Sequence, residues 1–77
     1  MRELIEFMVR SLVAAPDQVE VTEVDENGET VLEIAVAEDD LGRIIGRGGR
    51  VAGALRALAR AAAAREGRRV HLVILDD

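Results

Sequence analysis

The 77-residue sequence contains no cysteine, which excludes disulfide frameworks, zinc–thiolate sites and thiol nucleophiles. Its only histidine is His71, so neither a histidine metal cluster nor a Ser–His–Asp triad is expected. Phe7 is the only aromatic residue, which weighs against domains that stack bases on exposed rings. No apolar run approaches the roughly 20 residues that cross a bilayer, and the charged residues within 1–15 are not typical of a signal peptide. We therefore expect a cytoplasmic, non-catalytic protein with no cofactor, metal, small-molecule substrate or membrane contact.

The length and composition fit one small folded domain, residues 1–77. Apolar residues make up 49% and charged residues 32% of the chain, as in globular domains. The formal net charge is −5, but the charges are separated along the chain. Residues 1–40 hold two arginines and twelve acidic residues, whereas residues 41–69 hold eight arginines and one acidic residue. The second half can therefore focus a positive field despite the acidic total.

Hydrophobic patterning predicts a domain with the element order α-β-β-α-α-β. The expected elements are a helix at 2–14, strands at 18–24 and 30–37, a helical turn at 41–45, a helix at 50–66 and a strand at 70–75. Asn27-Gly28 predicts a hairpin turn, while Pro16 and Gly67 mark helix ends. The acidic run 38–40 is interpreted as helix caps, and His71 as a strand-surface residue.

The long helix has two expected faces. Its buried seam is predicted to consist of Val51, Leu55, Leu58 and Ala62. Arg56 and Arg60 are placed on the opposite face, where they would act only through the long-range field. In the strand at 30–37, Leu32, Ile34 and Val36 are expected to face the core.

The segment between the two later helices contains three glycines in four positions, Gly46, Gly48 and Gly49, with Arg47 among them. A simple connector does not need three glycines, because glycine carries an entropic cost. Close backbone approach to a ligand at a helix N-terminus, flanked by arginines, favours phosphate binding. A P-loop is excluded because no Lys-Ser/Thr follows the glycines, and a dinucleotide-binding fingerprint is excluded because its third glycine is missing. An EF-hand loop at residues 25–28 is excluded because Gly28 comes two residues too early for Ca²⁺ binding.

The sequence Ile45-Gly46-Arg47-Gly48-Gly49 between two helices resembles the GXXG loop of the KH domain, which clamps about four nucleotides. The element order resembles the type II KH arrangement, which implies an α+β fold in which three helices cover one face of a three-stranded sheet. Over the whole chain, the segments SLVAAPDQVEV, LEIAVAEDDLGRIIGRGGR and AAAAREGRRVHLVIL resemble the KhpA family of small bacterial RNA-binding proteins with a single KH domain. The resemblance implies that residues 43–51 bind single-stranded RNA, namely Arg43, Ile44, Ile45, Gly46, Arg47, Gly48, Gly49, Arg50 and Val51.

In this interpretation the loop amides and Arg47 hold phosphates. Ile44, Ile45, Val51 and the strand 32–36 form an aliphatic floor for bases, and one of the two isoleucines belongs to the core. The resemblance further implies an RNA chaperone in post-transcriptional regulation, linked in some bacteria to cell elongation. It also implies a homodimer, or a pair with a larger KhpB/Jag-type protein. The alternative is a KH-like protein–protein adaptor without a direct RNA role.

Overall fold

A computed structural model describes residues 1–76 of the chain. The predicted element order is confirmed. The helices are α1 (Arg2–Leu12), α2 (Leu41–Ile45) and α3 (Arg50–Arg65), and the strands are β1 (Glu20–Glu26), β2 (Glu29–Ala35) and β3 (Arg69–Ile74). Short 3-10 turns precede β1, α2 and α3, at Pro16–Gln18, Glu38–Asp40 and Arg47–Gly49.

The sheet is mixed, with β2 in the centre. β1 pairs with β2 antiparallel, and β3 pairs with β2 parallel. Asn27 and Gly28 join the first pair with φ angles of 51° and 81°, as a two-residue hairpin turn requires. The hairpin prediction from Asn-Gly is therefore confirmed, and the parallel pair needs the long crossover through α2 and α3.

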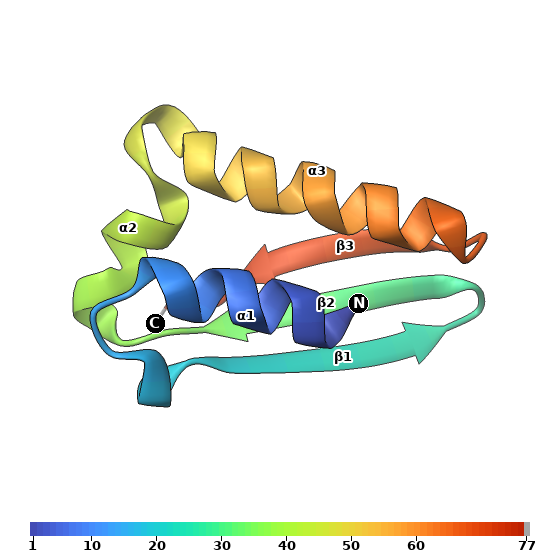
Figure 1. The fold of residues 1–77 in the computed structure, drawn as a ribbon. Helices are drawn as coiled ribbons and strands as arrows, with labels where there is room; N and C mark the ends of the chain where they lie inside the picture. Colours follow the sequence, from blue (N-terminus) through green and yellow to red (C-terminus); the bar gives the residue numbers. More distant parts are fainter. Residues whose placement is uncertain (77) are drawn as a thin grey trace.

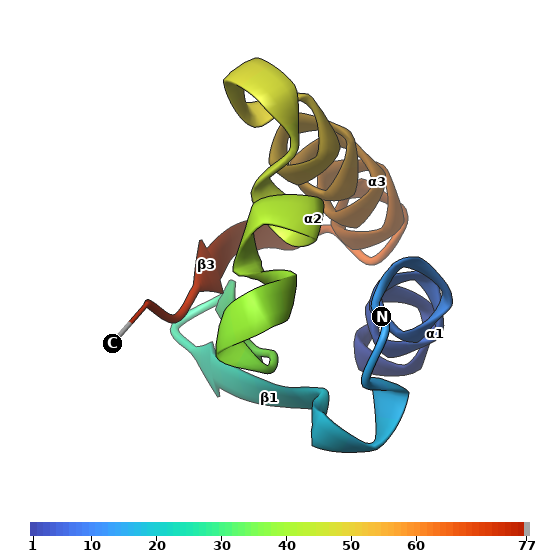
Figure 2. The same ribbon diagram turned by 90° about the vertical axis from the view of Figure 1, so that its left-hand side faces the viewer.

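All three helices lie on one face of the sheet, as Figures 1 and 2 show from two directions. α1 packs against β1, and α3 packs against β3. The core between the layers takes the inward side chains of the strands and one side of each helix: Ile5, Val9, Val19, Val21, Leu32, Ile34, Ile44, Leu55, Ala59 and Leu72. Leu32 and Ile34 are buried as expected, and Val36 packs at the margin of the core.

The buried side of α3 differs from the predicted seam. Ala52, Leu55, Ala59 and Ala63 are buried, whereas Val51, Leu58 and Ala62 are only partly buried. The prediction was therefore right only at Leu55. Three of the four buried residues are alanines, which have small side chains, so the α3 backbone can approach the sheet closely while the larger residues lie at the sides.

The ends of α1 and α3 lie close to the positions predicted from Pro16 and Gly67. α1 ends at Leu12 instead of residue 14, because the chain is already extended at the next residue before it reaches Pro16. Gly67 follows α3 with a φ of 68°. The N–H groups of Gly67 and Arg68 bond to carbonyls in the last turn of α3, which is the Schellman pattern.

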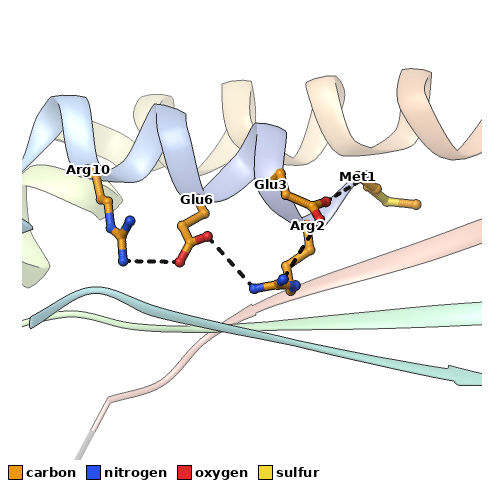
Figure 3. A network of polar contacts seen from close by, with 5 residues as sticks. All are labelled: Met1, Arg2, Glu3, Glu6 and Arg10. Carbon is orange, nitrogen blue, oxygen red and sulfur yellow. Dashed lines mark ion pairs between the residues drawn. The ribbon is translucent and has the colours of Figure 1, made fainter.

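The side of α1 next to the strands carries a ladder of ion pairs, drawn in Figure 3. Glu6 lies 3.7 Å from Arg2 and 3.2 Å from Arg10, one helical turn away on either side. Glu3 lies near Arg2 and the Met1 ammonium group. The pKa of Glu3 is lowered, first by a backbone hydrogen bond and then by the charges of Arg2 and the amino terminus. Both arginines of residues 1–40 are thus engaged by carboxylates, so unpaired positive charge lies in the later half of the chain.

Candidate nucleic-acid interface

The loop between α2 and α3 turns on glycines with positive φ angles. Gly46 has φ 75° and ψ 171°, and a Cβ atom added to it would lie 2.6 Å from Cγ2 and 2.8 Å from the backbone nitrogen of Val51. This region of φ and ψ is essentially restricted to glycine. Gly48 has φ 65° and ψ 20°, but no atom lies within 4 Å of its Cβ position. One end of the loop is therefore fixed against α3, while its tip is open to a ligand.

The N-terminus of α3 follows this tip directly. Gly49 is its N-cap residue, no side chain caps the helix, and the first turn contains no acidic residue. The first N–H groups of this 16-residue helix therefore have no side-chain acceptor and carry the positive end of the helix dipole. The N–H groups of Gly49 and Arg50 bond to the carbonyls of Gly46 and Arg47, so an anion at the loop tip would meet the remaining N–H groups of the loop and of the first turn of α3.

Three arginines surround the loop, and they differ in their partners. Arg47 and Arg50 are exposed, and neither forms an ion pair with a carboxylate of residues 1–76. The Arg43 side chain is 60% exposed, but its Nε lies 3.3 Å from Oδ1 of Asp40. Two guanidinium groups are therefore free for a phosphate, and the third is held on the side of α2.

Asp40 has a different role from the predicted helix cap. It makes no cap hydrogen bond, and neither do the residues before it in the acidic run. Instead its carboxylate is buried and accepts hydrogen bonds from the backbone N–H groups of Ala14 at 3.0 Å and Ala15 at 3.1 Å. The prediction was wrong because these partners lie 26 and 25 residues away, beyond any local pattern. Asp40 joins the segment after α1 to Arg43 and thereby supports the helix that leads into the loop.

Of the two isoleucines near the loop, one is buried and one is exposed, as expected. Part of the aliphatic surface that was predicted to contact bases is, however, buried. Ile44 is fully buried, and Ile45 is 40% exposed, which confirms that one of the two belongs to the core. Leu32 and Ile34 also have no exposed surface, so these residues cannot contact a base. Val51 is partly buried and packs against Gly46. Ile45 therefore presents the aliphatic surface at this end of the domain, while Ile44 and Val51 hold the loop in place.

A cleft between α3 and β3 was not predicted. It has a volume of about 240 Å³ and is lined by Arg56, Arg60 and residues 70–73 of β3. The placement of these arginines opposite the buried seam was therefore wrong. Because the buried side of α3 is centred on Ala52, Ala59 and Ala63, Arg56 falls beside it and is only partly exposed. The spacing of these alanines was the only sequence signal that could have located the cleft.

The free edge of β3 borders the same cleft. β3 is an edge strand, and the N–H groups of Arg69 and Leu75 bond to carbonyl groups of the β2 segment. Alternate residues of a strand direct their backbone groups to opposite sides, so those of Val70 and Leu72 point away from β2. The cleft thus combines guanidinium groups on one wall with unpaired backbone donors and acceptors on the other.

His71 is exposed on β3, as predicted, and its Nε2 lies 2.8 Å from Oε1 of Glu29. Within residues 1–76, no group of three or more histidine and acidic side chains is arranged to hold a metal ion. None of the helices in this part of the chain is long and apolar enough to span a membrane.

The mixed sheet, the helices on one face and the glycine loop between α2 and α3 define a KH domain of the type II arrangement. The family model for the KH domain of KhpA and KhpB matches residues 2–74, and the chain belongs to this family. The resemblance stated from the sequence is therefore confirmed.

Similar proteins agree with this assignment. The chain is 50% identical over 74 residues to the RNA-binding protein KhpA of Borreliella burgdorferi, covering 96% of this chain and 90% of that protein. It is 43% identical over 75 residues to the RNA-binding protein KhpA of Clostridium acetobutylicum, covering 97% and 100%. Both names describe RNA-binding proteins and not enzymes, in agreement with the expectation of a non-catalytic protein.

A solved structure supports the fold alone. A crystal structure of Era from Aquifex aeolicus, bound to GDP and an aluminium fluoride, superposes with a TM-score of 0.65 at 22% identity. The match covers 95% of this chain and 28% of the Era chain.

Proposed function

We propose that this protein binds single-stranded RNA and clamps its backbone at the loop 46–49. The observation that carries the proposal is the open loop tip at Gly48, next to a helix N-terminus without a side-chain cap and to Arg47 and Arg50, which form no ion pair within residues 1–76. Backbone N–H groups and guanidinium groups are the donors that bind phosphate. The names of the relatives agree with RNA as the ligand.

Within this proposal the predicted site residues have distinct roles. Gly46, Gly48 and Gly49 shape the loop, and Arg43, Arg47 and Arg50 supply positive charge. Ile45 offers an apolar surface to a base, while Ile44 and Val51 act by fixing the loop. The α3–β3 cleft is the path for the bases, because the free edge of β3 offers hydrogen-bond donors and acceptors to their edges.

A clamp on the backbone holds many sequences alike, and this supports a function as an RNA chaperone in post-transcriptional regulation. We also propose the role in cell elongation that the resemblance to the KhpA family implied. A measurable consequence is faster annealing of two complementary RNAs in the presence of the protein. An unchanged annealing rate at saturating protein would contradict the chaperone role without affecting RNA binding itself.

We further propose that the protein acts as a homodimer or together with a larger KhpB/Jag-type protein. The family model describes the KH domain of both KhpA and KhpB, so the proposed partner would carry a domain of the same kind. Leu4, Phe7 and Leu12 of α1 support the proposal, since their side chains are 41%, 66% and 40% exposed. Apolar side chains gathered on a surface are typical of protein contacts. Sedimentation of the purified chain over a range of concentrations would show a monomer throughout if self-association does not occur.

The test of the clamp is the double substitution Arg47→Asp and Gly48→Asp, which places negative charge where phosphates bind. Gly48 has open space around its Cβ position, and aspartate is among the residues that tolerate the left-handed conformation, so the fold is expected to persist. We expect at least a roughly tenfold loss of affinity for a short RNA, or about 1.4 kcal/mol.

The matched control is Ala61→Asp with Arg65→Asp, which makes the same change in net charge at exposed positions of α3 away from the loop. It should weaken binding far less. Equal affinity of the loop variant and the unchanged protein would overturn the clamp. If the unchanged protein shows no salt-dependent RNA binding at all, the adaptor function is favoured instead.

A further inference from the structure

A second basic hollow lies at the far end of the α3–β3 cleft. It has a volume of about 330 Å³ and is lined by Arg60, Arg68, Arg69, Val70 and His71. The first part of the cleft shares three of these residues, Arg60, Val70 and His71, so the two hollows are continuous. The far hollow is separate from the glycine loop, which lies at the opposite end of α3 in Figure 1.

Arg68 is held in position at this hollow by the sheet. Its Nε donates to the buried hydroxyl of Thr30 at 2.9 Å, and that hydroxyl donates to Oδ1 of Asp25 at 2.7 Å. Its Nη2 donates to the carbonyl of Glu29 at 3.2 Å and lies 3.2 Å from Asp25. Its Nη1 has no partner among residues 1–76, and the side chain is 27% exposed. The guanidinium group is therefore fixed in place with one nitrogen still able to donate.

The charged side chains that line the hollow are basic. Arg60 and Arg69 form no ion pair with a carboxylate of the described chain, residues 1–76. Asp25 lies 3.2 Å from Arg68 and Glu29 lies 2.8 Å from His71, and neither carboxylate lines the hollow. Three arginines and no carboxylate of residues 1–76 line the hollow, which suits an anion with several oxygens.

The direction of the cleft links this hollow to the loop. α3 runs away from the loop and β3 runs back toward it (Figure 1), and the cleft lies beside Arg56 and Arg60, in the part of α3 beyond the loop. Arg60 lies ten residues beyond Arg50, which corresponds to about 15 Å along the helix axis. A strand held by its phosphates at the loop can follow the cleft past Arg56 and reach the far hollow.

We propose that this far hollow is a second phosphate-binding site for the same RNA strand, formed by Arg60, Arg68 and Arg69. The inference rests on the proposed clamp and extends it: strands longer than the clamped segment gain contacts at the far end. The ligand is the phosphate backbone of single-stranded RNA, because guanidinium groups are phosphate donors and three arginines line the hollow.

The test compares two oligouridines, one of roughly four nucleotides, the length that a KH loop clamps, and one about twice as long. A third oligonucleotide has the longer length but neutral methylphosphonate linkages in its added half. It controls for the larger number of binding positions on a longer strand. The unchanged protein should bind the fully charged long strand about tenfold more tightly than the neutral-tailed one.

The variant is Arg60→Gln with Arg69→Gln, and its control is Arg10→Gln with Arg65→Gln, which removes the same charge elsewhere. The variant should bind the short strand as the unchanged protein does but lose the gain on the long strand. Its salt slope on the long strand should be shallower by about 1.4, equivalent to two phosphates at about 0.7 each. The control should keep most of the gain, and melting temperatures would confirm that both variants fold.

The outcomes separate this inference from the clamp. If the unchanged protein binds the short strand but gains nothing from charged linkages in the long one, the second site is wrong and the clamp stands. If the variant loses affinity equally for short and long strands, these arginines act through a general field and the second site is also wrong. If no strand binds, the clamp itself is wrong.

Discussion

The substitution Gly46→Ala tests whether the glycine loop has the geometry described above. The new Cβ atom would lie 2.6 Å from the Val51 side chain and 2.8 Å from its backbone nitrogen. The side chain can rotate, but the backbone nitrogen moves only if the first turn of α3 moves. The φ and ψ of Gly46 add about 1–3 kcal/mol of strain for any other residue.

Together with an overpacking cost of about 1–3 kcal/mol, we expect Gly46→Ala to lower the free energy of unfolding by about 3 kcal/mol. This is a large share of the roughly 4–12 kcal/mol typical of a domain of this length. Gly48→Ala is the matched control, because Gly48 also has a positive φ but has open space around its Cβ position. It should cost only about 1 kcal/mol, from the left-handed backbone alone.

Both variants would be measured by urea unfolding, with equal slopes required for the comparison. Gly48→Asn provides a third point, since asparagine tolerates the left-handed region and should cost less than alanine. A difference of less than about 0.5 kcal/mol between the two alanine variants would refute the close approach of Gly46 to α3, because surface changes alone reach that size.

Three further predictions follow from the contacts of single residues. Asp40→Ala should lower the free energy of unfolding by about 3 kcal/mol in urea, because two backbone N–H groups lose a charged acceptor; a loss below about 1 kcal/mol would contradict its role. Arg47→Ala should weaken RNA binding by about 1–2 kcal/mol in fluorescence anisotropy at fixed salt, and Arg56→Ala by a smaller but measurable amount because it lines the cleft. Equal losses at both would indicate a diffuse surface. The pKa of Glu3 is lowered from 4.5, so its contribution to stability is present at neutral pH and lost as the pH falls through its folded-state pKa. Thermal melts of Glu3→Gln should therefore lie slightly below those of the unchanged protein at neutral pH and coincide with them in strong acid.

Local patterns were enough to predict much of this fold. Asn27-Gly28 specifies a hairpin turn, and Gly67 ends α3 as expected, because both depend on backbone conformations that few residues accept. The difference between Ile44 and Ile45 also follows from local geometry, since adjacent residues of a helix point about 100° apart and the short helix α2 buries only one narrow side. These features could be predicted because the residues that determine them are neighbours in the chain.

The features that were missed depend on distant contacts. Alanine is common on both buried and exposed helix faces, so the sequence does not reveal that Ala52, Ala59 and Ala63 contact the sheet. The prediction instead gave the buried positions to larger residues and placed Arg56 on the wrong side. Asp40 was interpreted as a cap because its buried partners come from the segment after α1. The cleft arises only when α3 and β3 are brought together.

The parallel pairing of β2 with β3 also determines the order in which the domain can assemble. The residues paired across β1 and β2 are close in sequence, whereas Glu29 is paired with Arg69, forty positions later. Contacts of low sequence separation form first, and distant strand pairs form late because a long loop must close. The hairpin can therefore form while the rest of the chain is still unfolded. The glycine loop and the cleft lie within the segment that β3 closes, so the surface proposed to hold RNA is completed only in the last step of folding.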